Sequence, residues 1–340
     1  MLRAVRARLS RLSPRFVLGT NLVVASVLLA LALSWFGVPA LAVLSANPSW
    51  MGLGGFVAAV LAVLLVSAMR WRLVLRGVGQ APSLRALTLH SAAGQSVSML
   101  VPSARLGGDA VRAYLLAKDG VPAPACIATV AVDRVLDMGA TLAFAVVFAT
   151  LLLQVGVPAL GGVLVTMLVG LAGLGAGVWV TVRRLRSGRG VVTALARTTR
   201  LDRLGSVART MDVLHAAEAA AAELIAQRRR MAAAFVLGVG INLVVLVEYW
   251  FLLRAFGLPS NPLAVVAAIF GVGAASSMPV PAGVGVLEGS QMFLFSVLGH
   301  APEVGLAVGL AVRLRMLVWV VPGLLHLGVR GVVREAAATQ

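Results

Sequence analysis

The fold is decided by two short stretches that repeat each other, SMLVP at residues 98–102 and SMPVP at residues 277–281. They lie 179 positions apart, the difference between 98 and 277. Further pairs align at this offset or next to it: Trp71 with Trp250, Leu75-Arg76 with Leu253-Arg254, Asp109 with Glu288, and Arg134 with Arg313. An ordered set of matches at one spacing indicates an internal duplication. We therefore expect a chain built from two related halves.

Both stretches lie at the end of an apolar segment that contains small and polar residues and finishes at a proline. These segments are residues 84–101 and 262–281, and a short helix-like run follows each of them, at 110–117 and 291–298. Non-helical backbone at membrane depth is tolerated only where it lines a cavity or is buried in protein. The pattern therefore predicts two re-entrant, broken helices.

The composition is that of a membrane protein, because 60% of the 340 residues are hydrophobic and only 12% are charged. Soluble domains are about half apolar and a quarter charged. An apolar run of about 20 residues is long enough to cross a bilayer. Six runs qualify: residues 16–36, 50–69, 126–153, 158–182, 231–253 and 304–327. We expect an all-α integral membrane protein with about six full transmembrane helices plus two re-entrant broken-helix segments.

The basic residues indicate which side of the membrane each loop occupies. The net charge of +17 would suggest nucleic acid in a soluble protein, but here membrane lipids are the expected partner and nucleic acid is not. Arginines gather in the N-terminal tail, after residue 69 (Arg70, Arg72, Arg76 and Arg85), within 183–230, and near the C-terminus. Short cytoplasmic loops collect such residues. We expect a multi-pass protein of the cell (inner, cytoplasmic) membrane with both termini in the cytoplasm.

This orientation makes the two halves run in opposite directions. Residues 50–69 would pass from outside to inside, and their counterparts at 231–253 from inside to outside. Inverted repeats with discontinuous helices are a transporter architecture, with the substrate at the repeat interface. We expect one membrane domain over residues 1–340. It comprises a first half at 1–182 with repeat 1, a cytoplasmic linker at 183–230 and repeat 2 at 231–329.

The linker at 183–230 mixes charged residues and alanine with apolar residues at helical spacing. It is predicted either as amphipathic helices on the inner leaflet or as a solvated linker with snorkelling arginines.

The first motif, PSARLGGDAVR at 102–112, combines a helix-breaking proline, two turn-forming glycines, an acid and two flanking arginines. Its members are Pro102, Arg105, Gly107, Gly108, Asp109 and Arg112. We expect the acid to cap a helix that begins at Ala110 and to pair with the arginine three residues later. A helix N-terminus flanked by arginines can cradle a phosphate. The alternative is an interfacial turn whose arginines only snorkel.

The second motif places Asp133, Arg134 and Asp137 inside a predicted span. Ionisable groups within membrane helices cost roughly 2.5–3.5 kcal/mol each and by default indicate a functional site. We therefore expect an ion network here. The alternative is a structural salt bridge from the motif to Arg105 or Arg112.

The third motif, PVPAGVGVLEG at 279–289, has two prolines that break a helix and two glycines that free the next turn, followed by an acid. Its members are Pro279, Pro281, Gly283, Gly285 and Glu288. The acid either caps a half-helix or pairs with Arg313 or Arg315 in the last span.

As a set, these motifs resemble the lysylphosphatidylglycerol synthase transmembrane, or flippase-like, family. The resemblance rests on P-x-x-R-x-G-G-D-x-x-R at 102–112, D-R-x-x-D at 133–137 and P-x-P-x-G-x-G-x-x-E-G at 279–289, followed by an arginine in the final span. It covers nearly the whole chain and implies movement of phospholipids or polyprenyl-linked lipids between leaflets. Well-known members also carry a soluble C-terminal aminoacyl-transferase domain. This chain ends at Gln340, so the resemblance implies the flippase part and not the synthase activity.

The leading hypothesis is a lipid flippase, not an enzyme, that needs no cofactor. Arg105, Arg112, Arg134 and Arg313 would contact an anionic headgroup. Asp109, Asp133, Asp137 and Glu288 would hold these arginines in place, and Asp137 or Glu288 could carry a proton.

Two other classes of function stay open. One is an integral membrane enzyme acting on lipid phosphates, although a single cysteine, Cys126, and four scattered histidines offer no metal set. The other is a non-transporting scaffold for a separately encoded transferase. The glycine-rich run at 161–177 would also allow packing against a second copy of the chain.

Overall fold

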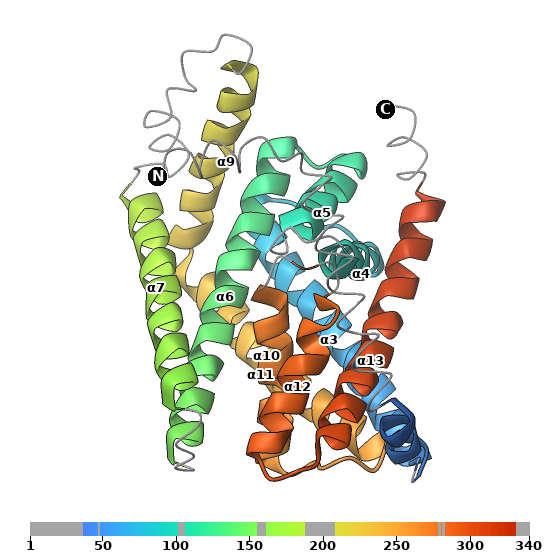
Figure 1. Ribbon diagram of the computed structural model, residues 1–340. Helices are drawn as coiled ribbons and strands as arrows, with labels where there is room; N and C mark the ends of the chain where they lie inside the picture. The colour runs from blue at the N-terminus through green and yellow to red at the C-terminus, as the bar shows by residue number, and fades with distance from the viewer. Residues whose placement is uncertain are drawn as a thin grey trace, which may run out of the picture. The chain divides into compact units, whose positions relative to one another are not determined.

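The computed structural model describes residues 37–46, 48–100, 106–154, 161–187, 208–277, 280 and 283–330, and these residues are almost entirely helical. Figure 1 shows the helices with their labels. No strand occurs within the described ranges, which confirms the all-α fold class predicted from the sequence.

Three of the described helices are long and apolar enough to cross a membrane. They are α3 (Trp50–Leu75), α10 (Arg228–Ala255) and α13 (Pro302–Val329). They contain the predicted spans at 50–69, 231–253 and 304–327. The first predicted span, at 16–36, lies outside the described residues.

The remaining two predicted spans fall on long helices. These are α6 (Ala123–Gln154), with 32 residues, and α7 (Gly161–Arg186), with 26 residues. At 1.5 Å per residue both exceed a hydrocarbon core of about 30 Å. The two segments predicted to be broken are pairs of shorter helices. These pairs are α4 (Leu84–Leu100) with α5 (Leu106–Lys118), and α11 (Pro262–Ser277) with α12 (Val286–Val297).

The glycines of the two broken segments behave differently. Gly283 and Gly285 have φ angles of 58° and 76°, so they form the predicted turn before α12. The prediction was wrong for Gly107 and Gly108, because α5 begins at Leu106 instead of Ala110 and both glycines are helical. Gly108 is buried, and its carbonyl oxygen would lie 2.8 Å from a Cβ placed on Gly94 of α4. A glycine lets these two helices approach closely at that point.

Four successive helices recur along the chain at nearly constant spacing. The first residues of α3, α4, α5 and α6 precede those of α10, α11, α12 and α13 by 178, 178, 180 and 179 positions. The helix boundaries therefore follow the same offset as the sequence matches.

The chain divides into two compact units, which we describe separately. Unit 1 comprises the residues up to Phe56 together with Val97–Gly107 and Tyr249–Val318. Unit 2 comprises Val57–Ser96, Gly108–Glu248 and the residues from Trp319.

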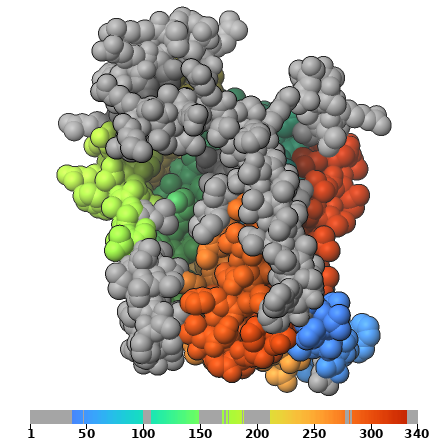
Figure 2. All heavy atoms as spheres, in the orientation of Figure 1, coloured from blue at the N-terminus to red at the C-terminus, as the bar shows by residue number. Residues whose placement is uncertain are grey.

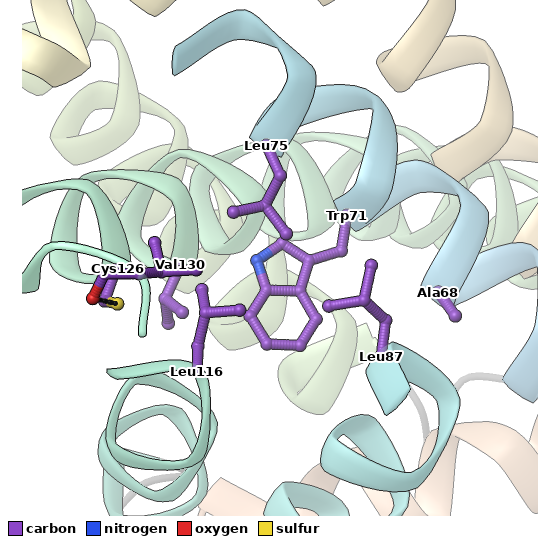
Figure 3. Close-up of a cluster of buried hydrophobic side chains, with 8 residues drawn as sticks. Ala68, Trp71, Leu75, Leu87, Leu116, Cys126 and Val130 are labelled. Carbon is purple, nitrogen blue, oxygen red and sulfur yellow. Dashed lines mark hydrogen bonds between the residues drawn. The ribbon is translucent and has the colours of Figure 1, made fainter. Parts of the chain in front are cut away.

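Two apolar clusters form the core of unit 2. In the first, shown in Figure 3, the fully buried ring of Trp71 lies among leucines from several helices. Its members are Ala68, Trp71, Leu75, Leu87, Leu116, Val121, Cys126 and Val130. The second cluster contains Val74, Ala128, Val132, Ala221, Leu224, Ile225 and Ala234.

The second cluster includes side chains from the described part of the predicted linker. Its described part contains α9 (Ala208–Ala226), whose Ala221, Leu224 and Ile225 pack against α3 and α6. The described part of the linker over residues 208–226 is thus helical, and the apolar side chains Ala221, Leu224 and Ile225 of this helix are covered by protein. Burying leucine and isoleucine against other side chains removes them from water as effectively as lipid does.

Within unit 1, small residues bring helices close together. Backbone atoms of Ala255 would lie 2.6 and 2.8 Å from a Cβ placed on Gly52, and those of Met292 would lie 2.5 Å from one on Gly305.

Apolar side chains face outward on α7 and α13, which are yellow-green and red in Figure 2. They include Val169, Trp179, Leu317, Val321 and Leu325. This exposure is expected where the solvent is lipid.

Candidate functional site

Six ionisable side chains from three helices form a charge cluster in unit 2. They are Arg70 of α3, Asp109 and Arg112 of α5, and Asp133, Arg134 and Asp137 of α6. We call this set the charge cluster. Three arginines face three carboxylates, so its formal charge is zero when all six groups are ionised.

Asp133 is the centre of the charge cluster and is only 1% exposed. One carboxylate oxygen accepts a hydrogen bond of 2.8 Å from Arg70 Nε, and the other accepts one of 2.7 Å from Arg112 Nη2. Charge-assisted hydrogen bonds of this length are strong. The two guanidinium groups therefore compensate the buried carboxylate. The pairing of Asp133 with Arg112 is one that the salt-bridge alternative foresaw.

Arg70 is a residue that the sequence interpretation missed. The sequence places Arg70 among the arginines that set the orientation of the chain in the membrane, because the predicted span ends at residue 69. Instead, α3 continues to Leu75, and Arg70 is 4% exposed. Its Nη1 atom donates to Asp137 at 3.1 Å while Nε donates to Asp133. The spacing of four between the two aspartates was the available signal, because it places both on one face of α6, where a single basic side chain can reach them.

Arg112 contacts several groups within unit 2. Its guanidinium carbon lies 4.1 Å from the ring centroid of Trp71, an attractive cation–π contact. A Cβ placed on Gly94 would lie 2.6 Å from Arg112 Cγ, so the stem of the arginine occupies the space that this glycine leaves. The predicted contact with Asp109 is present at 3.6 Å. Among the described residues, Arg112 Nε is a buried donor without a hydrogen-bond partner.

Arg134 is the most loosely held arginine of the charge cluster. Its contacts with Asp109 and Asp137 are 3.6 and 3.9 Å long, beyond normal hydrogen-bond distance. Its side chain is 25% exposed, compared with 5% for Arg70 and 14% for Arg112. Its donors are therefore the ones that an incoming anion could reach with the least rearrangement.

Unit 1 contains a separate ion pair between Glu288 of α12 and Arg313 of α13. Arg313 donates through Nε at 2.7 Å and through Nη2 at 3.2 Å to the two carboxylate oxygens. One of these oxygens also accepts a 2.8 Å hydrogen bond from the backbone N–H of Gly285, at the start of α12. Glu288 thus both caps its helix and pairs with Arg313, so the two predicted alternatives coexist. The guanidinium of Arg315 lies 4.8 Å from the ring centroid of Tyr249.

Of the eight predicted substrate-binding and supporting residues, all but Arg105 lie in these two groups. Pro102, Arg105, Pro279 and Pro281 lie outside the described residues. Within the described part of the chain, no group of three or more His, Cys, Asp or Glu side chains could hold a metal ion. The arrangement is instead suited to holding an anion, because guanidinium groups pair readily with phosphate and carboxylate.

The family model described as "Lysylphosphatidylglycerol synthase TM region" matches residues 16–323 of this chain. The chain belongs to this family. The family is defined by a transmembrane region, and three described helices are long and apolar enough to cross a membrane. The protein is therefore an integral membrane protein.

Two curated relatives of this family member are UPF0104 membrane proteins. A UPF0104 membrane protein of Methanocaldococcus jannaschii is 32% identical over 102 residues, which is 30% of this chain and 30% of that protein. A UPF0104 membrane protein of Methanothermobacter thermautotrophicus is 25% identical over 271 residues, 74% of this chain and 77% of that one. This chain thus matches less than a third of the first relative's length. No solved structure matches the chain.

Proposed function

We propose that this family member is a lipid flippase that moves an anionic phospholipid or polyprenyl-linked lipid between leaflets. The observation that carries the proposal is the charge cluster, in which one buried and two partly buried arginines are balanced by carboxylates and some of their N–H donors make no hydrogen bond. Among the described residues, Arg112 Nε has no hydrogen-bond partner, and the contacts of Arg134 are too long to be hydrogen bonds.

The energetic cost of the charge cluster supports a function for it. Each ionisable group within a membrane helix costs roughly 2.5–3.5 kcal/mol on insertion scales. Replacing a buried ion network by apolar side chains is often neutral or stabilising, so stability alone does not account for six charges. A ligand whose binding needs those charges does account for them.

A phosphate group is the ligand chemistry that fits. Its oxygens accept hydrogen bonds from several guanidinium donors at once, and arginine binds such planar sets of acceptors in a fixed geometry. Asp109 and Asp137 lie 3.6 and 3.9 Å from nitrogen atoms of Arg134. We propose that an incoming phosphate replaces these carboxylates at Arg134, while Asp133 keeps Arg112 and Arg70 in position.

The wider architecture supports transport over other membrane roles. The recurrence of four helices at one offset is typical of transporters built from repeats. We propose that the repeats are inverted, that α4–α5 and α11–α12 are re-entrant, and that six helices span the cell membrane with both termini in the cytoplasm. Non-helical breaks at membrane depth then line the route of the headgroup.

The proposal is tested in proteoliposomes that contain a fluorescent phosphatidylglycerol in both leaflets. A membrane-impermeant quencher reports how fast label leaves the protected inner leaflet. We expect the unmodified protein to accelerate this exchange, and Arg112→Ala and Arg134→Ala to slow it at least tenfold. Arg184→Ala, which changes an exposed arginine at the end of α7, is the matched control and should exchange at the unmodified rate.

The proposal is wrong if correctly inserted Arg112→Ala and Arg134→Ala proteins exchange the lipid as fast as the unmodified protein. We further propose that no chemistry is performed on the lipid. Thin-layer chromatography of the recovered lipid should then show a single unchanged species, and a new product that depends on the protein would instead indicate an enzyme.

A further inference from the structure

A second group of ionisable side chains lies in unit 2, apart from the charge cluster. It contains His90 of α4, Asp119 just after α5, His326 of α13 and Arg330 just after α13. We call this set the histidine group. Arg330 Nη1 donates to one carboxylate oxygen of Asp119 at 2.8 Å, and the other oxygen lies 3.4 Å from His90 Nε2. The histidine group therefore connects three helices that are far apart in the sequence.

The two histidine rings of this group lie against each other, with their centroids 5.4 Å apart. His90 is 0% exposed, and among the described residues neither of its ring nitrogens has a hydrogen-bond partner. The same holds, in that part of the chain, for the buried Nε2 atom of His326. Buried polar groups are normally hydrogen-bonded, so this pair of rings requires an explanation.

The charges around the rings determine which protonation state fits this arrangement. Two neutral rings can pack at this distance, whereas two protonated rings repel each other. Arg330 and Arg112 add positive charge that opposes protonation of His90, and Asp119 favours it. Asp119 is already bonded to Arg330, so its single negative charge cannot balance Arg330 and two protonated rings together. The histidine group as it stands therefore fits two neutral imidazoles.

The rings lie where α4 and α13 are packed closely. Gly323 precedes His326 by three positions, and a Cβ placed on it would lie 2.4 Å from the carbonyl oxygen of Ala92 in α4. Ser96 Oγ of α4 lies 3.1 Å from the carbonyl oxygen of Val320 in α13. Closely packed interiors transmit strain instead of absorbing it. Repulsion between the two rings would therefore push α4 and α13 apart.

The helix that carries His90 also contacts the charge cluster. Gly94 lies four positions after His90, one turn further along the same face of α4. A Cβ placed on Gly94 would lie 2.6 Å from Arg112 Cγ. A displacement of α4 would therefore also reach the stem of Arg112.

We infer that His90 and His326 form a proton-binding site that holds α4 and α13 together while both rings are neutral and loosens their contact when the rings are protonated. Each ring takes one proton from solvent onto its free ring nitrogen, and no other bond forms or breaks. Asp119, whose side chain is 21% exposed, is the contact through which protons reach the buried ring of His90. Histidine ordinarily titrates between pH 5 and 8, so mild acid is the signal.

The proton is the ligand that this group suits. Within the part of the chain that the structure describes, no set of His, Cys, Asp or Glu side chains could hold a metal ion. The acid-sensitive contact goes beyond the proposed lipid transport and does not rest on it, so the failure of either one leaves the other standing.

Amide hydrogen exchange over residues 319–329 of α13 reports how firmly this helix is held against α4. The unmodified protein, His90→Gln and His326→Gln are compared at the same pH, because intrinsic exchange rates depend on pH. At pH 5.5 we expect these amides to exchange about threefold faster in the unmodified protein than in either variant, since glutamine stays neutral. At pH 7.5 the three proteins should differ much less. His215→Gln, which changes an exposed histidine of α9, is the matched control and should behave like the unmodified protein at both pH values.

Thermal unfolding in detergent gives a second measurement. Rings that are held neutral in the folded protein become free to bind protons in the unfolded chain, which therefore binds more protons below about pH 6.5. The stability contributed by the neutral pair is present above that pH and is lost as the pH falls. From pH 7.5 to 5.5, the unfolding midpoint should fall further in the unmodified protein and in His215→Gln than in His90→Gln or His326→Gln.

Two variants keep the test decisive. His90 is fully buried, whereas His326 is only partly buried, so His326→Gln decides the question if His90→Gln does not fold. The inference is overturned if a folded variant shows the same acid-dependent rise in exchange as the unmodified protein. A loss of stability that is equal at both pH values would indicate a merely structural role for the rings and would also overturn it.

Discussion

Asp133 is the central residue of the charge cluster, because, among the described residues, it is the carboxylate of the cluster that accepts hydrogen bonds from two arginines. Both bonds are shorter than 3 Å, and the carboxylate is 1% exposed. Asp137 contacts Arg70 and Arg134 but is 29% exposed at its side chain. The two aspartates of one helix face therefore differ in how strongly they are coupled to the fold.

Asp133→Asn should destabilise the protein by about 3–5 kcal/mol, because it leaves two buried guanidinium groups without their shared negative charge. Asp137→Asn, the matched control, should cost about 1 kcal/mol, since solvent screens a partly exposed pair. Unfolding of the detergent-solubilised protein by increasing denaturant, followed by circular dichroism, measures both. Equal losses for the two variants would contradict the central role assigned to Asp133.

At this scale the sequence predicted some of the ion network and missed the rest for a physical reason. Asp109, Arg112, Asp133 and Asp137 were identifiable because charged residues in apolar or glycine-rich surroundings stand out. Arg70 was not, because an arginine at the end of a span is normally at the membrane surface. In the structure α3 continues to Leu75, and Arg70 is buried and bonded to Asp133 and Asp137 of α6.

At the scale of helices, α4 and α13 pack closely where α13 contains Pro322. The side chain of Ser96 lies 3.2 and 3.1 Å from the carbonyl oxygens of Trp319 and Val320, and it also contacts the Ala92 carbonyl at 2.8 Å. A Cβ placed on Gly323 would lie only 1.9 Å from Ser96 Oγ and 2.4 Å from the Ala92 oxygen. Pro322 removes one backbone donor from α13, and this polar, glycine-lined contact lies immediately beside it.

Gly323→Ala should therefore destabilise the protein by about 1–3 kcal/mol, the usual cost of overpacking a close helix contact. Gly328→Ala lies five residues further along the same helix and would meet nothing within 4 Å. It should be neutral or slightly stabilising, because alanine favours helix. Thermal unfolding of both variants in one detergent compares them, and a midpoint for Gly323→Ala equal to that of Gly328→Ala would disprove the close contact.

Helix positions were largely predictable because apolar runs, prolines and glycines mark them directly. Within the predicted segments at 84–101 and 262–281, the described residues form the short helices α4 and α11. The start of α5 was misplaced because glycine is read from sequence as a turn, whereas Gly108 serves the approach of α4 to α5. Such a tertiary contact leaves no local signal. The partner of α9 was missed for the same reason, since periodicity shows an apolar face but not what covers it.

At the scale of the whole molecule, the proposed inversion of the two halves has a direct test. Ala81 follows the first long helix of repeat 1, and Ser260 is its counterpart at the offset of 179. Cys126 is the single cysteine of the chain and is buried, so a Cys126→Ala protein provides the background for new cysteines.

In that background, Ala81→Cys should react with an impermeant maleimide only after the cell membrane is opened. Ser260→Cys should react in intact cells, because inversion places equivalent loops on opposite sides. Cysteine in place of Gln340 reports the side on which the C-terminus lies, which the proposed orientation places in the cytoplasm. Labelling of Ala81→Cys and Ser260→Cys from the same side would reject the inverted arrangement.

The charge balance of the cluster also bears on what drives the lipid. Three arginines and three carboxylates cancel, so, as far as the described residues go, an empty site carries no net charge across the membrane field. A bound phosphate adds its own negative charge, and only the loaded form then feels the membrane voltage, by about 2.3 kcal/mol per charge for each 100 mV. If the protein is the lipid flippase proposed above and the charge cluster lies within the membrane, this electrical work would favour outward movement of an anionic headgroup in a cell that is negative inside. Return of the site without a lipid would carry no net charge, so the proposed cycle would be electrogenic in one direction only.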